Sequence, residues 1–282
     1  MRNLNPMAVG PIIILCANAF FTGSFSLSKW LTTGTAVWVI MWFRFLAGPM
    51  FLGPYCAVTK HPLPMRSWPL LGFRVLCGIS AMSSLFFAFK YGDIAKSTLI
   101  FELSIIWTVI IEAILFKKRL HAYSLASLPV AFIGLMLVLN VTSFSQIQIG
   151  DAFALLGSFF NAGVYLSLKK LRDQYNTVTV VFWTYLLSSL IMLVPASSAL
   201  LSLKGPTLIG LLTMCAVGFV GQMLMTLGFK YSSASVSSLF MMSIVPFTAI
   251  SGAVFFNEVF TQITILGMAM VVASLMVVAR WR

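Results

Sequence analysis

Long apolar runs follow one another along almost the whole chain, and this pattern limits the possible folds more than any other feature. Ten such runs are separated by short polar or turn-rich stretches, at residues 7–28, 35–58, 69–89, 94–116, 122–142, 150–168, 177–201, 207–229, 234–256 and 262–279. A membrane-spanning helix needs about 20 apolar residues. A β-barrel is excluded, because barrel strands have roughly ten alternating residues. We therefore predict an all-α integral membrane protein with ten transmembrane helices.

The composition excludes a soluble domain. Of the 282 residues, 60% are hydrophobic and only 9% are charged, whereas soluble domains carry about 25% charged residues. The formal net charge is +12, which in a soluble protein would suggest a nucleic-acid partner. Here the basic residues lie in short loops between apolar runs, where they report membrane topology. We therefore expect contacts with membrane lipid and none with nucleic acid.

The loop charges predict the orientation of the ten helices. An even number of spans places both termini on one side, and twelve of the eighteen Lys and Arg residues lie on that side. They are Arg2, Lys60, Arg66, Lys117, Lys118, Arg119, Lys169, Lys170, Arg172, Lys230, Arg280 and Arg282. The opposite side holds only Lys29, Lys90, Lys96 and Lys204. Because basic loops stay in the cytoplasm, we predict a multi-pass protein of the bacterial inner membrane with both termini cytoplasmic.

The chain repeats itself at a shift of 140 residues. The matched positions include Phe89-Lys90-Tyr91 with Phe229-Lys230-Tyr231, Gly10 with Gly150, Gly78 with Gly218, and Lys29 with Lys169. The first run resembles a cleavable signal peptide, but its internal counterpart favours a membrane span. We predict two five-helix repeats, at residues 1–142 and 143–282. Five is an odd number, so the repeats would have inverted topology, which is typical of secondary transporters. An old duplication without alternating access is the alternative.

Away from the span ends, four charged side chains fall inside the predicted spans. Arg44 and Glu102 lie about 13 Å and about 12 Å from the outer ends of their spans, whereas Arg74 and Glu112 lie nearer the cytoplasmic side. A charge at mid-membrane costs about 2.5–3.5 kcal/mol, so each needs a partner or a purpose. The matched depths suggest an Arg44–Glu102 pair and an Arg74–Glu112 pair.

These pairs allow several roles. Arg44 and Glu102 could bind a zwitterionic substrate, Glu102 could carry a proton, or the two could only hold their helices together. Arg74 and Glu112 would form a gating or structural ion pair.

Neutral polar, aromatic and sulfur-containing side chains also occur within the spans. They could contact a substrate, provide a cation–π surface, or only hydrogen-bond and pack between helices. Pro246 is expected to kink the ninth span, and helix breaks mark binding sites in transporters. The further candidate substrate-binding residues are Asn18, Trp107, Asn161, Tyr165, Trp183, Gln222 and Met242.

No motif indicates an enzyme or an ATP-driven pump. The sequence has no P-loop and no Gly-rich dinucleotide turn, and its two His residues fall in loops. The four Cys residues show no CxxC spacing. We therefore expect no catalytic residue, no cofactor and no metal. The expected partner is a small-molecule substrate, with a proton as one candidate for coupling.

The second half carries the motif on which a family resemblance rests. Ser237 begins a stretch that runs through Pro246 to Asn257-Glu258, and this stretch resembles the EamA-type branch of the drug/metabolite transporter (DMT) superfamily. In the first half the positions that match Pro246 and Glu258 hold Ile106 and Lys118. The motif is therefore lost there.

The first half contributes shorter motifs to this resemblance. Arg44-Phe45 in the second span belongs to it, and together with Ser28-Lys29-Trp30-Leu31 and Arg74 it resembles the branch that includes S-adenosylmethionine transporters. Over the whole chain, the resemblance implies a central cavity lined by spans 1, 3, 4, 6, 8 and 9. Spans 5 and 10 would be peripheral, at a homodimer contact if one exists.

The function that fits these features is secondary active transport by alternating access. The substrate would be a small polar or amphipathic metabolite, with an amino acid or a derivative favoured. S-adenosylmethionine or another cationic metabolite, and broad drug efflux, remain alternatives within this class. A channel or a lipid-handling scaffold is the alternative from another class.

Overall fold

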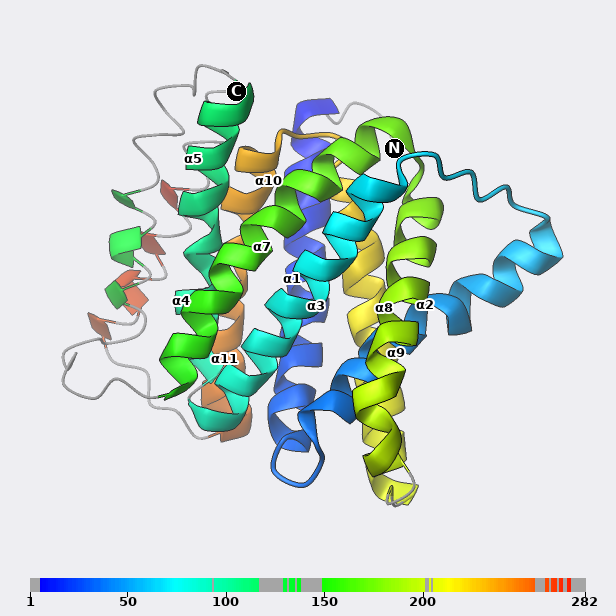
Figure 1. The fold of residues 1–282 in the computed structure, drawn as a ribbon. Helices are drawn as coiled ribbons and strands as arrows, with labels where there is room; N and C mark the ends of the chain where they lie inside the picture. The colour runs from blue at the N-terminus through cyan, green and yellow to red at the C-terminus, as the bar shows by residue number, and fades with distance from the viewer. Residues whose placement is uncertain are drawn as a thin grey trace.

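The computed structural model describes residues 6–92, 94–116, 149–200, 203 and 205–256, with short helical pieces between 129 and 137 and between 262 and 274. Every regular element in these ranges is an α-helix (Figure 1). The helices are α1 (Pro6–Leu31), α2 (Val37–Thr59), α3 (Trp68–Tyr91), α4 (Ile94–Glu102), α5 (Ser104–Phe116), α7 (Ile149–Gln174), α8 (Thr177–Leu200), α9 (Gly205–Gly228), α10 (Ala234–Met241) and α11 (Ile244–Phe256). The predicted spans 5 and 10 fall largely outside the described residues, and so does the dimer contact expected there. Lys118 and Glu258 also lie outside the described residues.

The fold is that of a multi-pass membrane protein. Seven segments of the described chain are long and apolar enough to cross a bilayer, and one of them, Val236–Phe255, includes α10 and α11. Large apolar side chains such as Val58, Leu76 and Ile209 are exposed on the outside of the bundle. Such a surface suits lipid and not water. The predicted all-α membrane fold is confirmed.

The two halves pack on each other with matched contacts. A Cβ at Gly10, near the start of α1, would lie 3.2 Å from the Gly228 carbonyl oxygen at the end of α9. A Cβ at Gly150, at the start of α7, would lie 3.0 Å from the Ala88 carbonyl oxygen near the end of α3. Both glycines and both carbonyls are related by the shift of 140 residues. Each first helix therefore packs tightly against the third helix of the other half.

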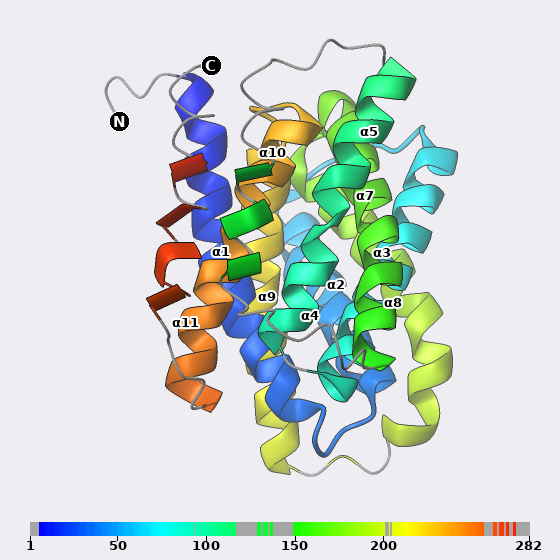
Figure 2. The ribbon, with the colours of Figure 1, turned by 90° about the vertical axis from the view of Figure 1, so that its left-hand side faces the viewer.

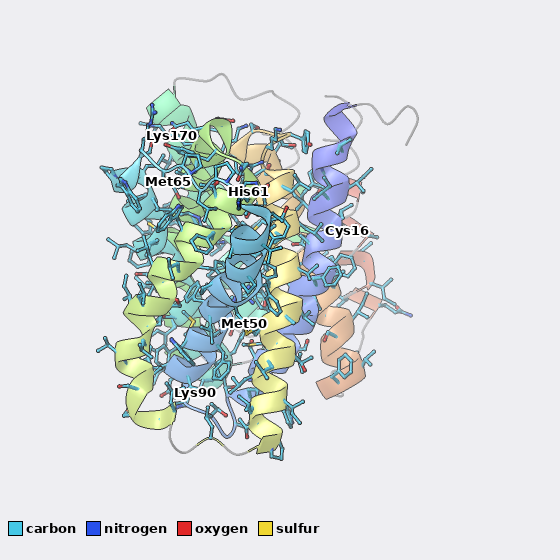
Figure 3. All side chains as sticks on the ribbon, turned by 90° about the vertical axis from the view of Figure 1, so that its right-hand side faces the viewer. Cys16, Met50, His61, Met65, Lys90 and Lys170 are labelled. Carbon is cyan, nitrogen blue, oxygen red and sulfur yellow. The ribbon has the colours of Figure 1, made fainter. Side chains whose placement is uncertain are left out.

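The halves also run in opposite directions. The Lys29 ammonium at the end of α1 donates to the Phe89 carbonyl at the end of α3, over 2.6 Å. Since α7 starts at that same end of the bundle, α1 and α7 are antiparallel, as Figure 1 shows. Figure 3 places Lys170 and His61 toward one end and Lys90 at the other. This arrangement agrees with the distribution of loop charges.

Two helices break at matched places. Leu103 separates α4 from α5, and Met242 with Ser243 separates α10 from α11. Leu103 and Ser243 are related by the shift of 140 residues. The broken helices lie beside each other, with α10 against α5 and α11 against α4 (Figure 2). The first half has Ile106 where the second half has Pro246, and its helix still breaks at the matched place. The break therefore does not require the proline.

The second break is bridged by α1. Pro246 has no N–H, and the Val245 N–H donates to the Met242 carbonyl over 3.0 Å. The Asn18 side-chain amide donates to the Phe240 and Met241 carbonyls over 3.0 and 3.2 Å, and to the Ser243 hydroxyl over 2.7 Å. An unsatisfied backbone carbonyl in the membrane costs several kcal/mol. Asn18 therefore holds the broken helix to α1.

We expect the Asn18→Ala substitution to destabilise the protein by about 1–3 kcal/mol, because the acceptors at the break lose their hydrogen bonds from the Asn18 amide. The thermal unfolding midpoint of the purified protein in detergent measures this effect. Thr22→Ala is the matched control, since the one acceptor of the Thr22 hydroxyl among the described residues is the Asn18 carbonyl of its own helix. Equal midpoints for the two variants would contradict the bridging role of Asn18.

Candidate substrate cavity

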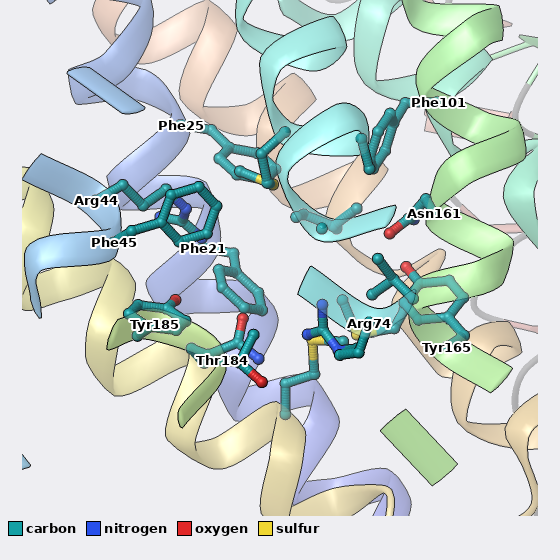
Figure 4. Close-up of a pocket in the computed structure, with 18 of the residues that line it drawn as sticks. Phe21, Phe25, Arg44, Phe45, Arg74, Phe101, Asn161, Tyr165, Thr184 and Tyr185 are labelled. Atoms are coloured by element: carbon teal, nitrogen blue, oxygen red, sulfur yellow. The ribbon is translucent and has the colours of Figure 1, made fainter. Parts of the chain in front are cut away.

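A cavity lies between the two halves, and the empty space inside it, open solvent included, is about 600 Å³. Figure 4 shows the side chains that meet in it. They are Phe21, Phe25, Arg44, Phe45, Arg74, Gly78, Ala81, Met82, Phe101, Glu102, Asn161, Val164, Tyr165, Thr184, Tyr185, Gln222, Met225, Met241 and Ile244. The expected set of spans was incomplete, because α2 and α8 also contribute.

Arg44 reaches the cavity from α2 and is held by α1. One guanidinium nitrogen, Nη1, donates to the Ser24 hydroxyl over 2.8 Å. The guanidinium carbon lies 5.4 Å from the centre of the Phe21 ring and 5.8 Å from that of Phe25. The side chain is only 3% exposed. Ring faces and one hydroxyl hold the cation in place but do not neutralise it.

Arg74 enters the same cavity from α3, on a different side from Arg44 (Figure 4). Its side chain is 5% exposed, and its Nε has no hydrogen-bond partner in the described part of the chain. A guanidinium has five N–H donors in a fixed plane. Arg74 therefore has donor capacity that a ligand in the cavity could use.

Glu102 is the last residue of α4 and lies at the helix break. Its side chain is 3% exposed, and Oε2 has no hydrogen-bond partner among the described residues. Among ion pairs whose two partners are both described, only one has an N···O distance within 4.0 Å. It joins Lys169 to Asp173 over 2.7 Å, at the end of α7. The Arg44–Glu102 pair expected from matched depths is thus not formed, because depth does not fix the direction in which a helix points a side chain.

The Arg74–Glu112 pair is not formed either. Arg74 lines the central cavity, whereas Glu112 is buried near the other end of α5 and is not in the lining. A gating role for this pair therefore has no geometric support. Both residues remain buried charges whose helices place them apart.

Three of the neutral candidates line the cavity. The Asn161 amide of α7 donates to the Ser104 hydroxyl at the start of α5 over 3.0 Å, so it also contacts the first helix break. Tyr165 stacks on Phe229 with 5.5 Å between ring centres. The Gln222 amide donates to the Thr226 hydroxyl on the same helix over 3.1 Å. All three add polar groups to the cavity lining.

Four candidates are outside the lining. Asn18 bridges the second helix break, and Met242 is buried at that break. The Trp107 indole donates to the Ser158 hydroxyl over 3.3 Å, and its ring is 37% exposed on the bundle surface. The Trp183 indole donates to the Leu63 carbonyl in the loop before α3, over 3.1 Å. Their roles in the structure are bridging, packing and anchoring.

The sequence reasoning missed most of the aromatic lining. Phe21, Phe25, Phe45, Phe101 and Tyr185 contribute much of the wall. Phe21 and Phe25 are four residues apart on one helix face, which is the one signal that could have identified them. The cavity is therefore apolar and aromatic, with two buried guanidiniums and one carboxyl group.

The cavity also shows which repeat positions have diverged. Glu102 corresponds to Met242, and Asn161 corresponds to Phe21. The two halves therefore contribute different chemistry to a common cavity. A site of this kind suits a substrate with distinct charged and apolar parts.

Comparisons with known proteins give a consistent result. Residues 8–140 and 148–280 each match the EamA-like transporter family. Over 98% of both chains, the sequence is 21% identical to the pseudopaline exporter CntI of Pseudomonas aeruginosa. An uncharacterized transporter of Helicobacter pylori is 25% identical over 111 residues, which are 39% of this chain and 37% of the other. A solved crystal structure covers 98% of both chains with a TM-score of 0.77 at 13% identity. None of these proteins is described as an S-adenosylmethionine transporter, so that resemblance is not supported.

We expect Glu102→Met to raise the free energy of unfolding by about 1–3 kcal/mol, because it removes a buried carboxyl group whose Oε2 has no hydrogen-bond partner among the described residues. Met is also the residue at the matched repeat position, Met242. The thermal unfolding midpoint in detergent provides the measurement. Asp173→Asn is the control, since a surface ion pair contributes about 0–1 kcal/mol. A lower midpoint for Glu102→Met would mean that the carboxyl group stabilises the fold.

Proposed function

Because the chain belongs to the EamA-like transporter family, we propose that it moves a small polar or amphipathic metabolite across the bacterial inner membrane by secondary active transport. The chain is a transporter and not an enzyme. The observation that carries the proposal is the cavity between two oppositely oriented halves, with Arg44, Arg74 and Glu102 buried in its wall. Buried charges in a membrane protein mark a substrate or ion pathway.

Alternating access is supported by the pairing of the helices. We take residues 1–142 and 143–282 as the two repeats. The contact of α1 with α9 and that of α7 with α3 are counterparts. If the halves exchange conformations, the tight contact at one end of the bundle could open as the matched contact at the other end closes. The breaks beside the cavity give the moving helices short rigid segments.

An amino acid or an amino acid derivative is the substrate class that we favour. Guanidinium groups bind carboxylates through paired hydrogen bonds, and Glu102 offers an acceptor for an amine. The phenylalanine and methionine side chains suit an apolar substituent. Export is the direction that we favour, because the pseudopaline exporter is similar over nearly the full length of both chains.

A proton is our candidate for the coupling ion. In the described part of the chain, Glu102 is the only acidic residue of the cavity lining, and its Oε2 lacks a partner there. A carboxyl group at a helix break could gain and lose a proton as its surroundings change. Coupling to another ion gradient is the alternative.

Transport is tested with the purified protein in liposomes and a radiolabelled panel of amino acids and their N-substituted derivatives. We expect saturable flux and counterflow for at least one compound, with accumulation that depends on a pH gradient. Arg44→Gln should lower the flux about tenfold or more, since a hydrogen bond to a charged group is lost. Arg66→Gln, in the loop before α3, should leave it unchanged.

The outcomes of the flux assay separate the alternatives. Flux without saturation or counterflow would contradict a carrier and favour a channel. Movement of many unrelated compounds at similar rates would favour broad drug efflux. Absence of flux for every compound, with or without a pH gradient, would contradict the proposed function.

Orientation is a separate prediction. In a variant without Cys16, Cys56, Cys77 and Cys215, we expect Thr33→Cys to react with a membrane-impermeant maleimide in intact cells. His61→Cys should react only after permeabilisation, because the loop between α2 and α3 is expected in the cytoplasm. Labelling of both positions from the same side would contradict the predicted topology.

A further inference from the structure

We propose that the substrate carries two acidic groups on an apolar skeleton, one bound by Arg44 and the other by Arg74. This inference rests on the proposed transport function and defines its substrate more closely. It follows from where the two guanidiniums lie relative to the internal repeat.

Each guanidinium lies against a glycine. A Cβ built at Gly78 of α3 would lie 2.8 Å from Nη1 of Arg74. A Cβ built at Gly218 of α9 would lie 2.2 Å from Nη1 of Arg44. Contacts under 3.0 Å are too close for a real Cβ atom. In both places, the missing side chain makes room for the cation.

The two glycines are counterparts in the repeat, but the two arginines are not. Gly78 and Gly218 match at the shift of 140 residues, whereas Arg44 matches Thr184 and Arg74 matches Met214. One arginine comes from α2 and the other from α3, yet they deliver their guanidiniums to matched places on α9 and α3. The chain thus sets two cations in equivalent positions of the two halves, by different routes.

Neither cation is neutralised by the described protein. Arg44 has a hydroxyl and two ring faces as neighbours, and Arg74 has an Nε without a partner. Neither forms an ion pair with Glu102. A buried charge without a counterion is costly. Two acidic groups of a ligand would supply the counterions, each through the paired hydrogen bonds that a guanidinium can make.

The surroundings of the cations indicate the rest of the ligand. Figure 4 shows Phe21 and Tyr185 beside Arg44, and Tyr165 and Asn161 on the side of Arg74. Apolar side chains such as Met82 and Met225 complete the wall. A hydrocarbon or aromatic skeleton between the acidic groups would contact these side chains and bury apolar surface.

Binding of three matched probes tests this inference. Benzylsuccinate has two carboxylates on an aromatic skeleton, its monoamide has one, and its diamide has none. Calorimetry with the purified protein in lipid nanodiscs gives the three dissociation constants. We expect benzylsuccinate to bind about tenfold or more tightly than the monoamide, and the monoamide more tightly than the diamide.

Two single substitutions assign the carboxylates. Arg44→Gln and Arg74→Gln should each reduce the preference for benzylsuccinate over the monoamide to about twofold or less. The proposal is wrong if the natural protein binds both probes equally, or if either variant keeps the full preference. Saturable binding of benzylsuccinate without flux or counterflow of any panel compound would instead refute the transport function.

Glycine variants provide an independent arm that leaves both arginines in place. Gly78→Ala and Gly218→Ala should lower the preference for benzylsuccinate several-fold, because each Cβ displaces a guanidinium. Gly72→Ala is the control on the same helix as Gly78, since a Cβ there has nothing within 4 Å. An unchanged preference in both Gly78→Ala and Gly218→Ala, with folding verified by the thermal midpoint, would overturn the paired site.

Discussion

Backbone groups in a lipid bilayer must be hydrogen-bonded within the protein, and this requirement governs the two broken helices on which the cavity depends. At the second break, the Asn18 side-chain amide donates to the Phe240 and Met241 carbonyls, and the Phe240 carbonyl also accepts from the Ser243 N–H across the local turn. At the first break, Asn161 donates to the Ser104 hydroxyl. In each case an asparagine of one half reaches the broken helix of the other half. The hydrogen bonds at the breaks therefore connect the two halves.

The same geometry explains why charged residues can be tolerated beside the breaks. Glu102 ends α4, and its side chain lines the cavity instead of meeting lipid. Gly218 leaves space for the Arg44 guanidinium, and Gly78 leaves space for the Arg74 guanidinium. Because the cavity separates these three charges from the hydrocarbon, the cost of burying them depends on the occupant of the cavity. A ligand with complementary charges would lower that cost.

Much of the architecture could be predicted from the sequence, because hydrophobic run length and the repeat are properties of the chain alone. The spans of α1, α2, α3 and α7 to α9 follow the apolar runs closely. Whether Arg44 and Glu102 pair could not be predicted, because sequence spacing gives the depth of the two residues but not the direction of their side chains. For the same reason, the sequence left open whether Asn18 binds substrate or bonds between helices, and in the structure its amide donates to the Phe240 carbonyl of α10.

The internal repeat indicates where the two guanidiniums lie only when it is combined with the contacts of the structure. Gly78 and Gly218 matched in the sequence, but a glycine pair alone indicates only close packing. Its meaning depends on Arg44 crossing from α2 to α9, a contact between segments far apart in the chain. Duplication therefore conserved the small residue that leaves the space, while different helices came to supply the cation that fills it. This divergence lets a symmetric scaffold hold a substrate that has no symmetry, since Glu102 of the first half lines the cavity, whereas the matched Met242 of the second half lies outside the lining.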